Sequence, residues 1–126
     1  EVSFKYRRRN FRINVNVCNN IQKIIGLMFK TKENADSLLF DFKKPVNMKI
    51  HSMFVFFPFI AIWLDRKNKV IGLKKISPFK ISLTPKRPFI RLIEIPINQK
   101  YAKIVKLLFS RRWLETFKYR IILYFV

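Results

Sequence analysis

Hydrophobic and polar residues alternate strictly in two segments near the start of the chain. In "FRINVNV" the side chains of Phe11, Ile13, Val15 and Val17 fall on one side of an extended segment, and polar side chains fall on the other. Such alternation predicts a half-buried strand. The preceding "VSFKY" alternates in the same way. We therefore predict that the two segments pair as strands, with "RRRN" as the connection.

A second pattern is the run "MFVFFPFIAIWL" at residues 53–64, which holds no charged or polar side chain. It is too short for a membrane helix, which needs about 20 apolar residues, and Pro58 would interrupt a helix. Its Phe, Val, Ile and Trp residues favour strands. We predict strands over residues 53–57 and 59–64, a bend at Pro58, a turn over residues 65–69 and a return strand from Lys69. Because the run is apolar on both faces, it should lie centrally in a sheet that is covered on both sides.

Two segments have helical spacing instead. The first covers residues 21–28, follows the capping residues Asn19 and Asn20, and is expected to close at Gly26. The second, residues 100–112, has lysines and arginines on one side and an apolar stripe on the other. The stripe consists of Tyr101, Ile104, Val105, Leu108 and Phe109. Further strands are predicted at residues 37–42, 80–83, 89–95 and 117–126.

Together these elements predict a mainly β protein. We expect a compact β-sandwich or flattened barrel, with one short helix in the N-terminal half and a basic amphipathic helix near the C-terminus. The length of 126 residues fits a single domain over residues 1–126. A single cysteine, Cys18, excludes an intramolecular disulfide and is interpreted as a small buried or half-buried side chain.

Several short motifs stand in an order that resembles a known family. "GLMFK" at residues 26–30 precedes "LLFDF" at 38–42, "IHSMFVFFPFIAIWLDRKNKVI" at 50–71, "PF" at 78–79 and "LIEIP" at 92–96. This series is similar to domain-of-unknown-function family 192, over about residues 11–96, and resembles its archaeal branch. The resemblance implies a compact β-rich fold with one short helix and no established activity. Ile60 stands where the family often has Asp, and residues 97–126 depart from the family's glycine-rich ending.

The charge of the chain points to a class of partner. Lysine and arginine number 27 against 7 aspartates and glutamates, which gives a net charge of +20. An AT-rich genome would enrich lysine, but it would not remove the acidic residues. Because a domain with this charge repels itself, the composition favours an anionic partner. Nucleic-acid phosphates and anionic membrane surfaces are the two candidates.

The candidate binding residues are basic clusters that alternate with aromatic residues. Phosphate oxygens accept hydrogen bonds from guanidinium and ammonium groups, and bases stack on aromatic rings. The expected anion-binding residues are Arg7, Arg8, Arg9, Arg12, Lys74, Lys75, Lys86, Arg87, Lys103, Lys106, Arg111 and Arg112, with Trp113 and Phe89 as stacking residues. For any one cluster, a solvated face is the favoured explanation. The scarcity of acidic residues favours binding for the set.

Candidate catalytic chemistry is sparse. His51 is the single histidine, and a metal site would need Cys18, Asp41 and Glu94 to converge on it, so we interpret it as a strand-edge residue. Glu94 is expected to be partly buried beside an arginine or lysine, because an unpaired buried carboxylate shifts its pKa. With two glycines, a glycine-rich phosphate loop is excluded. No catalytic residue, metal or cofactor is predicted, and an enzyme is the least favoured class.

The sequence therefore favours a non-catalytic binding module for an anionic polymer such as RNA or DNA. One alternative is a membrane-surface or protein-docking module that uses the helix at residues 100–112, although such a stripe more often packs on a core. Another is a small-ligand-binding β-sandwich. We expect a cytoplasmic location and no transmembrane span in this chain, and an upstream signal or anchor stays open.

Overall fold

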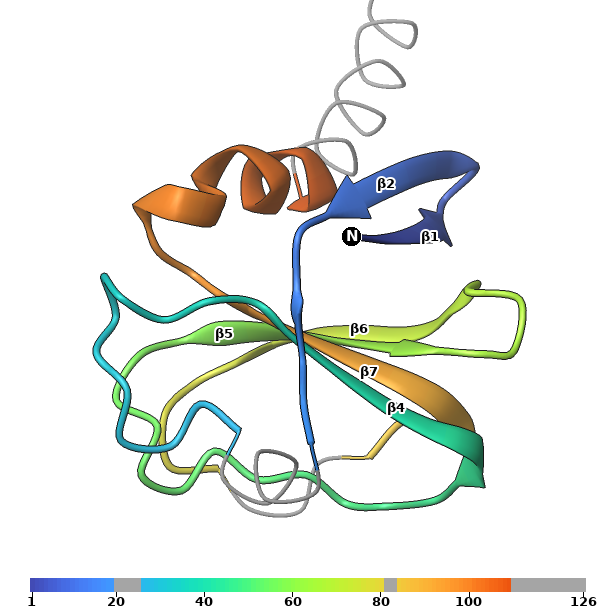
Figure 1. Ribbon diagram of the computed structural model, residues 1–126, viewed down its shortest axis with the longest axis horizontal. Helices are drawn as coiled ribbons and strands as arrows, with labels where there is room; N and C mark the ends of the chain where they lie inside the picture. The colour runs from blue at the N-terminus through green and yellow to red at the C-terminus, as the bar shows by residue number, and fades with distance from the viewer. Residues whose placement is uncertain (20–25, 81–83, 110–126) are drawn as a thin grey trace, which may run out of the picture.

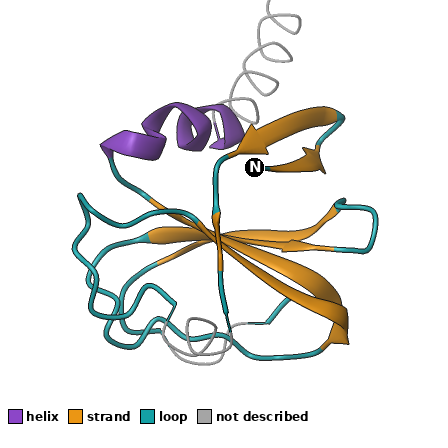
Figure 2. Ribbon diagram, in the orientation of Figure 1, coloured by secondary structure: helices purple, strands orange, loops and turns teal. Residues whose placement is uncertain are grey.

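The protein is described here by a computed structural model that covers residues 1–19, 26–80 and 84–109. Its strands are β1 (Val2–Tyr6), β2 (Arg9–Ile13), β3 (Asn16–Val17), β4 (Leu38–Val46), β5 (Phe59–Leu64), β6 (Val70–Ile76) and β7 (Phe89–Pro96). A 3-10 turn, η1 (Gln99–Tyr101), leads into an α-helix described over residues 102–109. We name the two together the C-terminal helix. The regular structure of the described chain is mostly strand (Figure 2), so the predicted mainly β fold is confirmed.

The strands form two sheets (Figure 1). β1 and β2 make an antiparallel hairpin, and the others make an open five-stranded sheet in the order β3-β4-β7-β5-β6. β7 is central and pairs antiparallel with β4 on one side and β5 on the other. Every residue of β5 is buried, as its two-sided apolar run predicts. This pairing places Glu94 of β7 between Leu38 and Ala61.

The two faces of the large sheet have different covers. The β1–β2 hairpin and the C-terminal helix lie on one face, and loops lie on the other (Figure 1). Under the hairpin, the rings of Phe4 and Phe11 stack with centroids 5.4 Å apart. Under the loops, Leu27 and Phe57 pack against the side chains of the sheet. The larger sheet therefore has a separate hydrophobic cluster on each face.

The apolar stripe of the C-terminal helix packs on the core. Leu108 is 2% exposed and belongs to the cluster beneath the hairpin, with Tyr101 and Ile104 packed at its border. Asn98 caps the turn by accepting a hydrogen bond from the Tyr101 amide. The Tyr101 hydroxyl in turn accepts from the Ser37 amide at 2.7 Å. Phe109 departs from the stripe and is 39% exposed.

The structure corrects the prediction of a strand over residues 53–57. This segment is a series of turns, in which the Val55 amide donates to the Ser52 carbonyl and Phe54 adopts a φ of 60°. Val55 and Phe57 point into the core, whereas Phe54 and Phe56 are exposed. The alternation of side chains resembles a strand, but none of the strands in the described part of the chain pairs with the segment.

Other boundaries also differ from the prediction. β4 does not end at residues 43–45 but continues to Val46 through an irregularity at which Lys43 has a φ of 62°. Val17 does not continue the buried side of β2, since it is 65% exposed. Gly26 has the left-handed φ of 55° that suits the end of a helix, but most of the predicted helix at 21–28 lies outside the described residues. The same holds for residues 81–83 and for the predicted strand at 117–126, while Lys80 lies in no strand.

Candidate functional site

The turn of the β1–β2 hairpin consists of two arginines. Tyr6 pairs with Arg9, which leaves Arg7 and Arg8 as the connecting residues. Their φ angles are 51° and 65°. Two-residue hairpin turns of this type require positive φ at both positions and normally use Asn and Gly. The chain therefore places two long basic side chains where backbone geometry disfavours them.

Further cations lie on the solvent side of the same hairpin. Lys5 and Arg12 are exposed, because the alternate residues Phe4 and Phe11 fill the face that meets the sheet. The Arg7 guanidinium lies 5.3 Å from the centroid of the Tyr6 ring. Such a cation–π contact holds the arginine at the surface without neutralising its charge.

A second basic turn lies beside the hairpin. The turn between β5 and β6 is held by the Asp65 carboxylate, which accepts hydrogen bonds from the Lys67 and Lys69 amides at 2.8 and 3.0 Å, as predicted for residues 65–69. The Lys5 amide donates to the Asn68 carbonyl at 3.0 Å, and Lys5 forms a parallel bridge with Lys69. The two turns lie at the same end of the molecule (Figure 1). We name their basic residues the cationic hairpin surface: Lys5, Arg7, Arg8, Arg9, Arg12, Arg66, Lys67 and Lys69.

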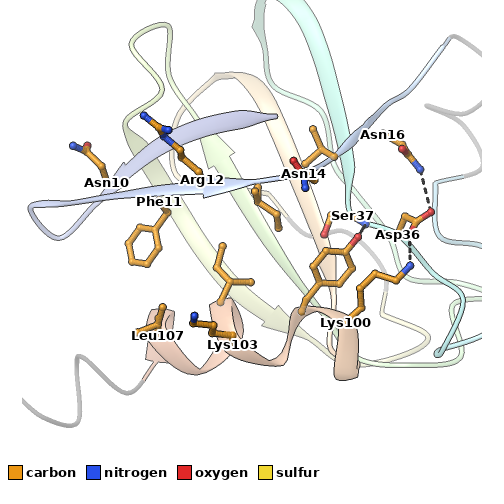
Figure 3. A pocket seen from close by; sticks show the side chains of 14 residues that line it. Asn10, Phe11, Arg12, Asn14, Asn16, Asp36, Ser37, Lys100, Lys103 and Leu107 are labelled. Carbon is orange, nitrogen blue, oxygen red and sulfur yellow. Dashed lines mark hydrogen bonds and ion pairs between the residues drawn. The ribbon is translucent and has the colours of Figure 1, made fainter.

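A groove continues from this surface toward the C-terminal helix. It has a volume of about 660 Å³ and lies between residues 10–16 and the helix. In Figure 3, Phe11 points to the helix side of the strand, and Asn10 and Arg12 point to the other side. Lys103 lies on the helix wall, and neither Lys103 nor Arg12 forms an ion pair with a described residue. Their charges are therefore available to a ligand.

The acidic residue of the groove, Asp36, is already paired. It accepts hydrogen bonds from the ammonium group of Lys100 and from the Asn16 amide nitrogen (Figure 3). The bond from Lys100 lowers the pKa of Asp36, and the same bond raises the pKa of Lys100. Because the carboxylate is neutralised locally, it does little to weaken the positive potential of the groove.

The structure brings together only part of the predicted binding set. Arg7, Arg8, Arg9 and Arg12 share one surface, and Lys103 borders the adjoining groove. The other described residues of the predicted set are exposed elsewhere on the protein. They are Lys74 and Lys75 on β6, Lys86 and Arg87 before β7, and Lys106 beside a different hollow near Glu33. Arg111, Arg112 and Trp113 lie outside the described residues.

One predicted residue is wrong, and three basic residues were missed. Phe89 is fully buried and its ring packs edge-on against Phe42, so it cannot stack on a ligand. Arg66, Lys67 and Lys69 were interpreted only as a turn, although "DRKNK" is itself a basic cluster. That cluster was the available signal, but its position beside "RRRN" depends on a contact between distant segments.

A second hollow lies under the loops on the opposite face of the sheet. It has a volume of about 270 Å³, and Leu27, Met28 and Phe40 form part of its apolar wall. Glu94 also lines it and is 7% exposed. Burial raises the pKa of Glu94 from 4.5 to about 8, against the opposing positive charge of Lys30. No described residue forms an ion pair with Glu94, so the prediction that an arginine or lysine pairs with it is wrong for the described chain.

His51 and Lys49 line this second hollow as well, so with Glu94 the structure brings three titratable side chains to one cavity. The Nδ1 atom of His51 accepts a hydrogen bond from the Met53 amide at 3.3 Å. His51 is exposed and lies next to an isolated bridge at Ile50, not in one of the named strands. Within residues 1–19, 26–80 and 84–109, no three histidine, cysteine or acidic residues gather closely enough to hold a metal ion.

Comparisons with known proteins identify a family and a fold. The sequence profile of the family described as Uncharacterized ACR, or DUF192, matches residues 4–105. The structure resembles that of a protein of unknown function from Novosphingobium aromaticivorans, with a TM-score of 0.65 and 16% identity over 80% of this chain and 74% of that chain. It also resembles a "putative transcription regulator" from Sinorhizobium meliloti, with a TM-score of 0.64 and 15% identity over 75% and 76% of the two chains. No curated protein matches the sequence.

Proposed function

The chain belongs to the uncharacterised DUF192 family, and on that premise we propose that it is a non-catalytic module that binds an anionic polymer such as RNA or DNA. The observation that supports this proposal is the meeting of two basic turns through the Lys5–Asn68 hydrogen bond. Residues 5–12 and 65–69 contain one acidic residue, Asp65, and its carboxylate is engaged by backbone amides.

Two features of this surface are unfavourable for the free protein. Lys5 and Lys69 are neighbours in a bridge, and like charges at such positions destabilise a pairing. Arg7 and Arg8 hold left-handed backbone conformations that cost free energy for residues with a Cβ atom. A polyanion relieves the repulsion, and the guanidinium groups offer the planar donors that phosphate oxygens bind in pairs.

The adjoining groove extends the same interface. Lys103 supplies a cation from the C-terminal helix, and Asn14 supplies an amide donor and acceptor along residues 10–16. Amides of this kind contact the sugar and phosphate groups of nucleic acids. In this arrangement the phosphate backbone lies across the cationic hairpin surface and passes the mouth of the groove.

Fluorescence anisotropy with a labelled 20-base-pair DNA duplex, and with an RNA duplex of the same sequence, tests the proposal. If about 6 phosphates are contacted, the affinity falls roughly a thousandfold between 50 and 200 mM salt. The triple variant R7Q/R8Q/R12Q should lower the magnitude of the salt slope by about 3. The double variant K74Q/K75Q, which removes cations from β6, is the control and should leave the salt slope nearly unchanged.

Two outcomes contradict the proposal. The first is an absence of binding at 50 mM salt. The second is an equal loss per removed charge in the triple variant and the β6 control, which would indicate a general effect of net charge and no dedicated surface.

A second candidate function, the binding of a small ligand by the β-sandwich, is favoured by the cavity at Glu94. A half-enclosed, mainly apolar cavity with a few polar groups has the general character of a ligand site. The neutral carboxyl group that predominates below pH 8 offers both a hydrogen-bond donor and an acceptor. A fragment screen by thermal shift, repeated on Glu94→Leu, tests this function. Hits that persist in the variant would argue against a site at Glu94.

A further inference from the structure

The loops that cover the second face of the sheet expose four phenylalanines. Phe29 is 67% exposed, Phe54 45%, Phe56 60% and Phe79 48%. The rings of Phe29 and Phe54 stack at 5.2 Å, and those of Phe56 and Phe79 meet edge-on at 5.4 Å. Because Phe54 and Phe56 flank the inward-pointing Val55, the two pairs belong to one surface. We name these four residues the aromatic loop surface.

Three of the four residues have a backbone conformation that phenylalanine disfavours. The φ angles of Phe29, Phe54 and Phe79 are each 60°. A bulky residue at positive φ is unusual, and Asn or Gly accepts that conformation at a lower cost. The core does not require these rings, because the adjacent Val55 and Phe57 supply the buried contacts of the segment. The fold alone therefore gives no reason for phenylalanine at these positions.

The loops are nevertheless fixed to one another. Ser52 is fully buried, and its hydroxyl donates to the Ser77 carbonyl at 2.7 Å and accepts from the Lys80 amide at 2.6 Å. The Ser52 carbonyl accepts from the Phe79 amide, and the Phe54 carbonyl accepts from the Phe29 amide, each at 2.9 Å. These bonds connect three loops and present the four rings together, so their exposure is built into the structure.

The formal charges within the segments that carry the rings are all positive. The loop segments 26–32, 47–57 and 77–80 contain no acidic residue, and their formal charges come from Lys30, Lys32, Lys49 and Lys80. Phe29 precedes Lys30 and Phe79 precedes Lys80, so two rings have a lysine directly beside them in the chain. Protein interfaces favour arginine and are depleted of lysine, whereas aromatic rings beside lysines suit an anionic lipid surface.

We propose that the aromatic loop surface docks the protein on an anionic lipid bilayer, with the four rings inserted at the boundary of the headgroups and acyl chains. The lysines of the same loops lie at the level of the lipid phosphates. This surface lies on the face of the large sheet opposite the cationic hairpin surface (Figure 1). A docked molecule therefore keeps its basic hairpin directed away from the bilayer, and the two interactions are separable.

Sedimentation with vesicles of phosphatidylcholine, with or without 30% phosphatidylglycerol, tests the proposal on the full chain. Wild type should bind the anionic vesicles at least tenfold more tightly than the neutral ones. The double variant F29N/F54N should weaken binding to anionic vesicles at least tenfold and leave the melting temperature equal or higher, because Asn tolerates both φ angles. The control is F109N, which removes an exposed phenylalanine from the C-terminal helix and should bind as wild type does.

A second pair of variants keeps the test decisive. Phe56→Ser removes a ring from a residue with ordinary φ and should also weaken vesicle binding. It provides the test if F29N/F54N folds poorly. R7Q/R8Q/R12Q should retain vesicle binding while it loses oligonucleotide binding, which separates this proposal from the proposed function. The proposal is overturned if folded F29N/F54N binds anionic vesicles as tightly as the wild type does. A lack of wild-type binding to either vesicle also overturns it and indicates a protein partner for the surface.

Discussion

Lys5 and Lys69 lie next to each other in a parallel bridge that joins β1 to the turn before β6. The Lys5 amide bonds to the Asn68 carbonyl at 3.0 Å, so the backbone holds the two ammonium-bearing residues together. The attraction between the segments comes from the backbone and from the hydrophobic side of the hairpin. The like charges of the Lys5 and Lys69 side chains are unfavourable for this contact.

Replacing Lys69 by Glu should therefore stabilise the protein and weaken its binding to polyanions. An opposite-charge pair with Lys5 contributes about 0.2–1 kcal/mol relative to a neutral pair, and the repulsion is lost as well. Urea unfolding measures the first effect, and oligonucleotide affinity at 100 mM salt measures the second. Lys74→Glu, on β6 away from the hairpin, is the matched control for net charge. A loss of stability in Lys69→Glu would contradict the argument.

The double variant R7N/R8G should make the β1–β2 hairpin more stable. Asn and Gly adopt the positive φ angles of this turn at little cost, and strained residues cost about 1–3 kcal/mol each. We expect the free energy of unfolding to rise by roughly 1 kcal/mol or more. The magnitude of the salt slope for oligonucleotide binding should fall by about 2 in the same variant. R7Q/R8Q serves as the control, since it removes the charges and keeps the strain.

Glu94 makes the stability of the protein depend on pH. The pKa of an unperturbed glutamate carboxyl group is 4.5, and burial raises the pKa of Glu94 to about 8 in the folded protein. Between these two pH values the folded state therefore binds a proton that the unfolded state releases. The stability that this protonation contributes is complete below pH 4.5 and is lost progressively as the pH rises to about 8. At 1.36 kcal/mol per pKa unit the loss is on the order of 4–5 kcal/mol. Glu94→Gln should flatten this decline in urea unfolding at pH 5, 7 and 9, while Glu33→Gln, at an exposed position, should not.

Leu108→Asp should unfold the protein or destabilise it severely. Leu108 is 2% exposed within the cluster beneath the hairpin, and truncation of such a residue costs about 2–5 kcal/mol before the burial of a charge is added. Lys106→Asp places the same charge on the exposed side of the helix and should have little effect on stability. Circular dichroism during thermal unfolding checks both. A stable Leu108→Asp variant that had lost only membrane binding would show that the stripe faces a bilayer.

Ser52→Ala should loosen the loops that carry the aromatic surface. The hydroxyl of the buried Ser52 bonds to the backbone of Ser77 and Lys80, and its loss removes two partly buried hydrogen bonds, each of which contributes about 0.5–1.5 kcal/mol. Hydrogen exchange should speed up at the Lys80 amide, and vesicle binding should weaken. Ser77→Ala is the control, because Ser77 is exposed and contributes its backbone carbonyl to this network. Unchanged exchange at Lys80 in the Ser52 variant would argue against this role.

Periodicity predicted much of the fold. The hairpin of β1 and β2 follows from alternation, and the inward stripe of the helix follows from helical spacing. The β5–β6 pair follows from an apolar run and the turn after it, and β7 follows from the prolines that bound its segment. Residues 53–57 misled the prediction because Phe54 and Phe56 are apolar and yet exposed. A local pattern reports which residues share a side, and it does not report whether a partner strand or solvent lies beside them.

The candidate site was predicted in part for the same reason. "RRRNFR" is a cluster within one segment, so the sequence shows it directly. The addition of Arg66, Lys67 and Lys69 depends on the contact between Lys5 and Asn68, which joins segments far apart in the chain. Glu94 was expected to have an ion-pair partner, because burial of a carboxylate normally demands one. Its raised pKa shows that the protein instead keeps the group protonated near neutral pH.

The position of β6 at the end of the strand order has a consequence for how copies of the protein behave together. An edge strand offers backbone groups to which another chain can hydrogen-bond, and lysine on such a strand is a common protection against that association. Lys74 and Lys75 occupy this strand. Mutual repulsion between copies would then keep the protein dispersed, and multivalent counter-ions that shield these lysines would promote its self-association.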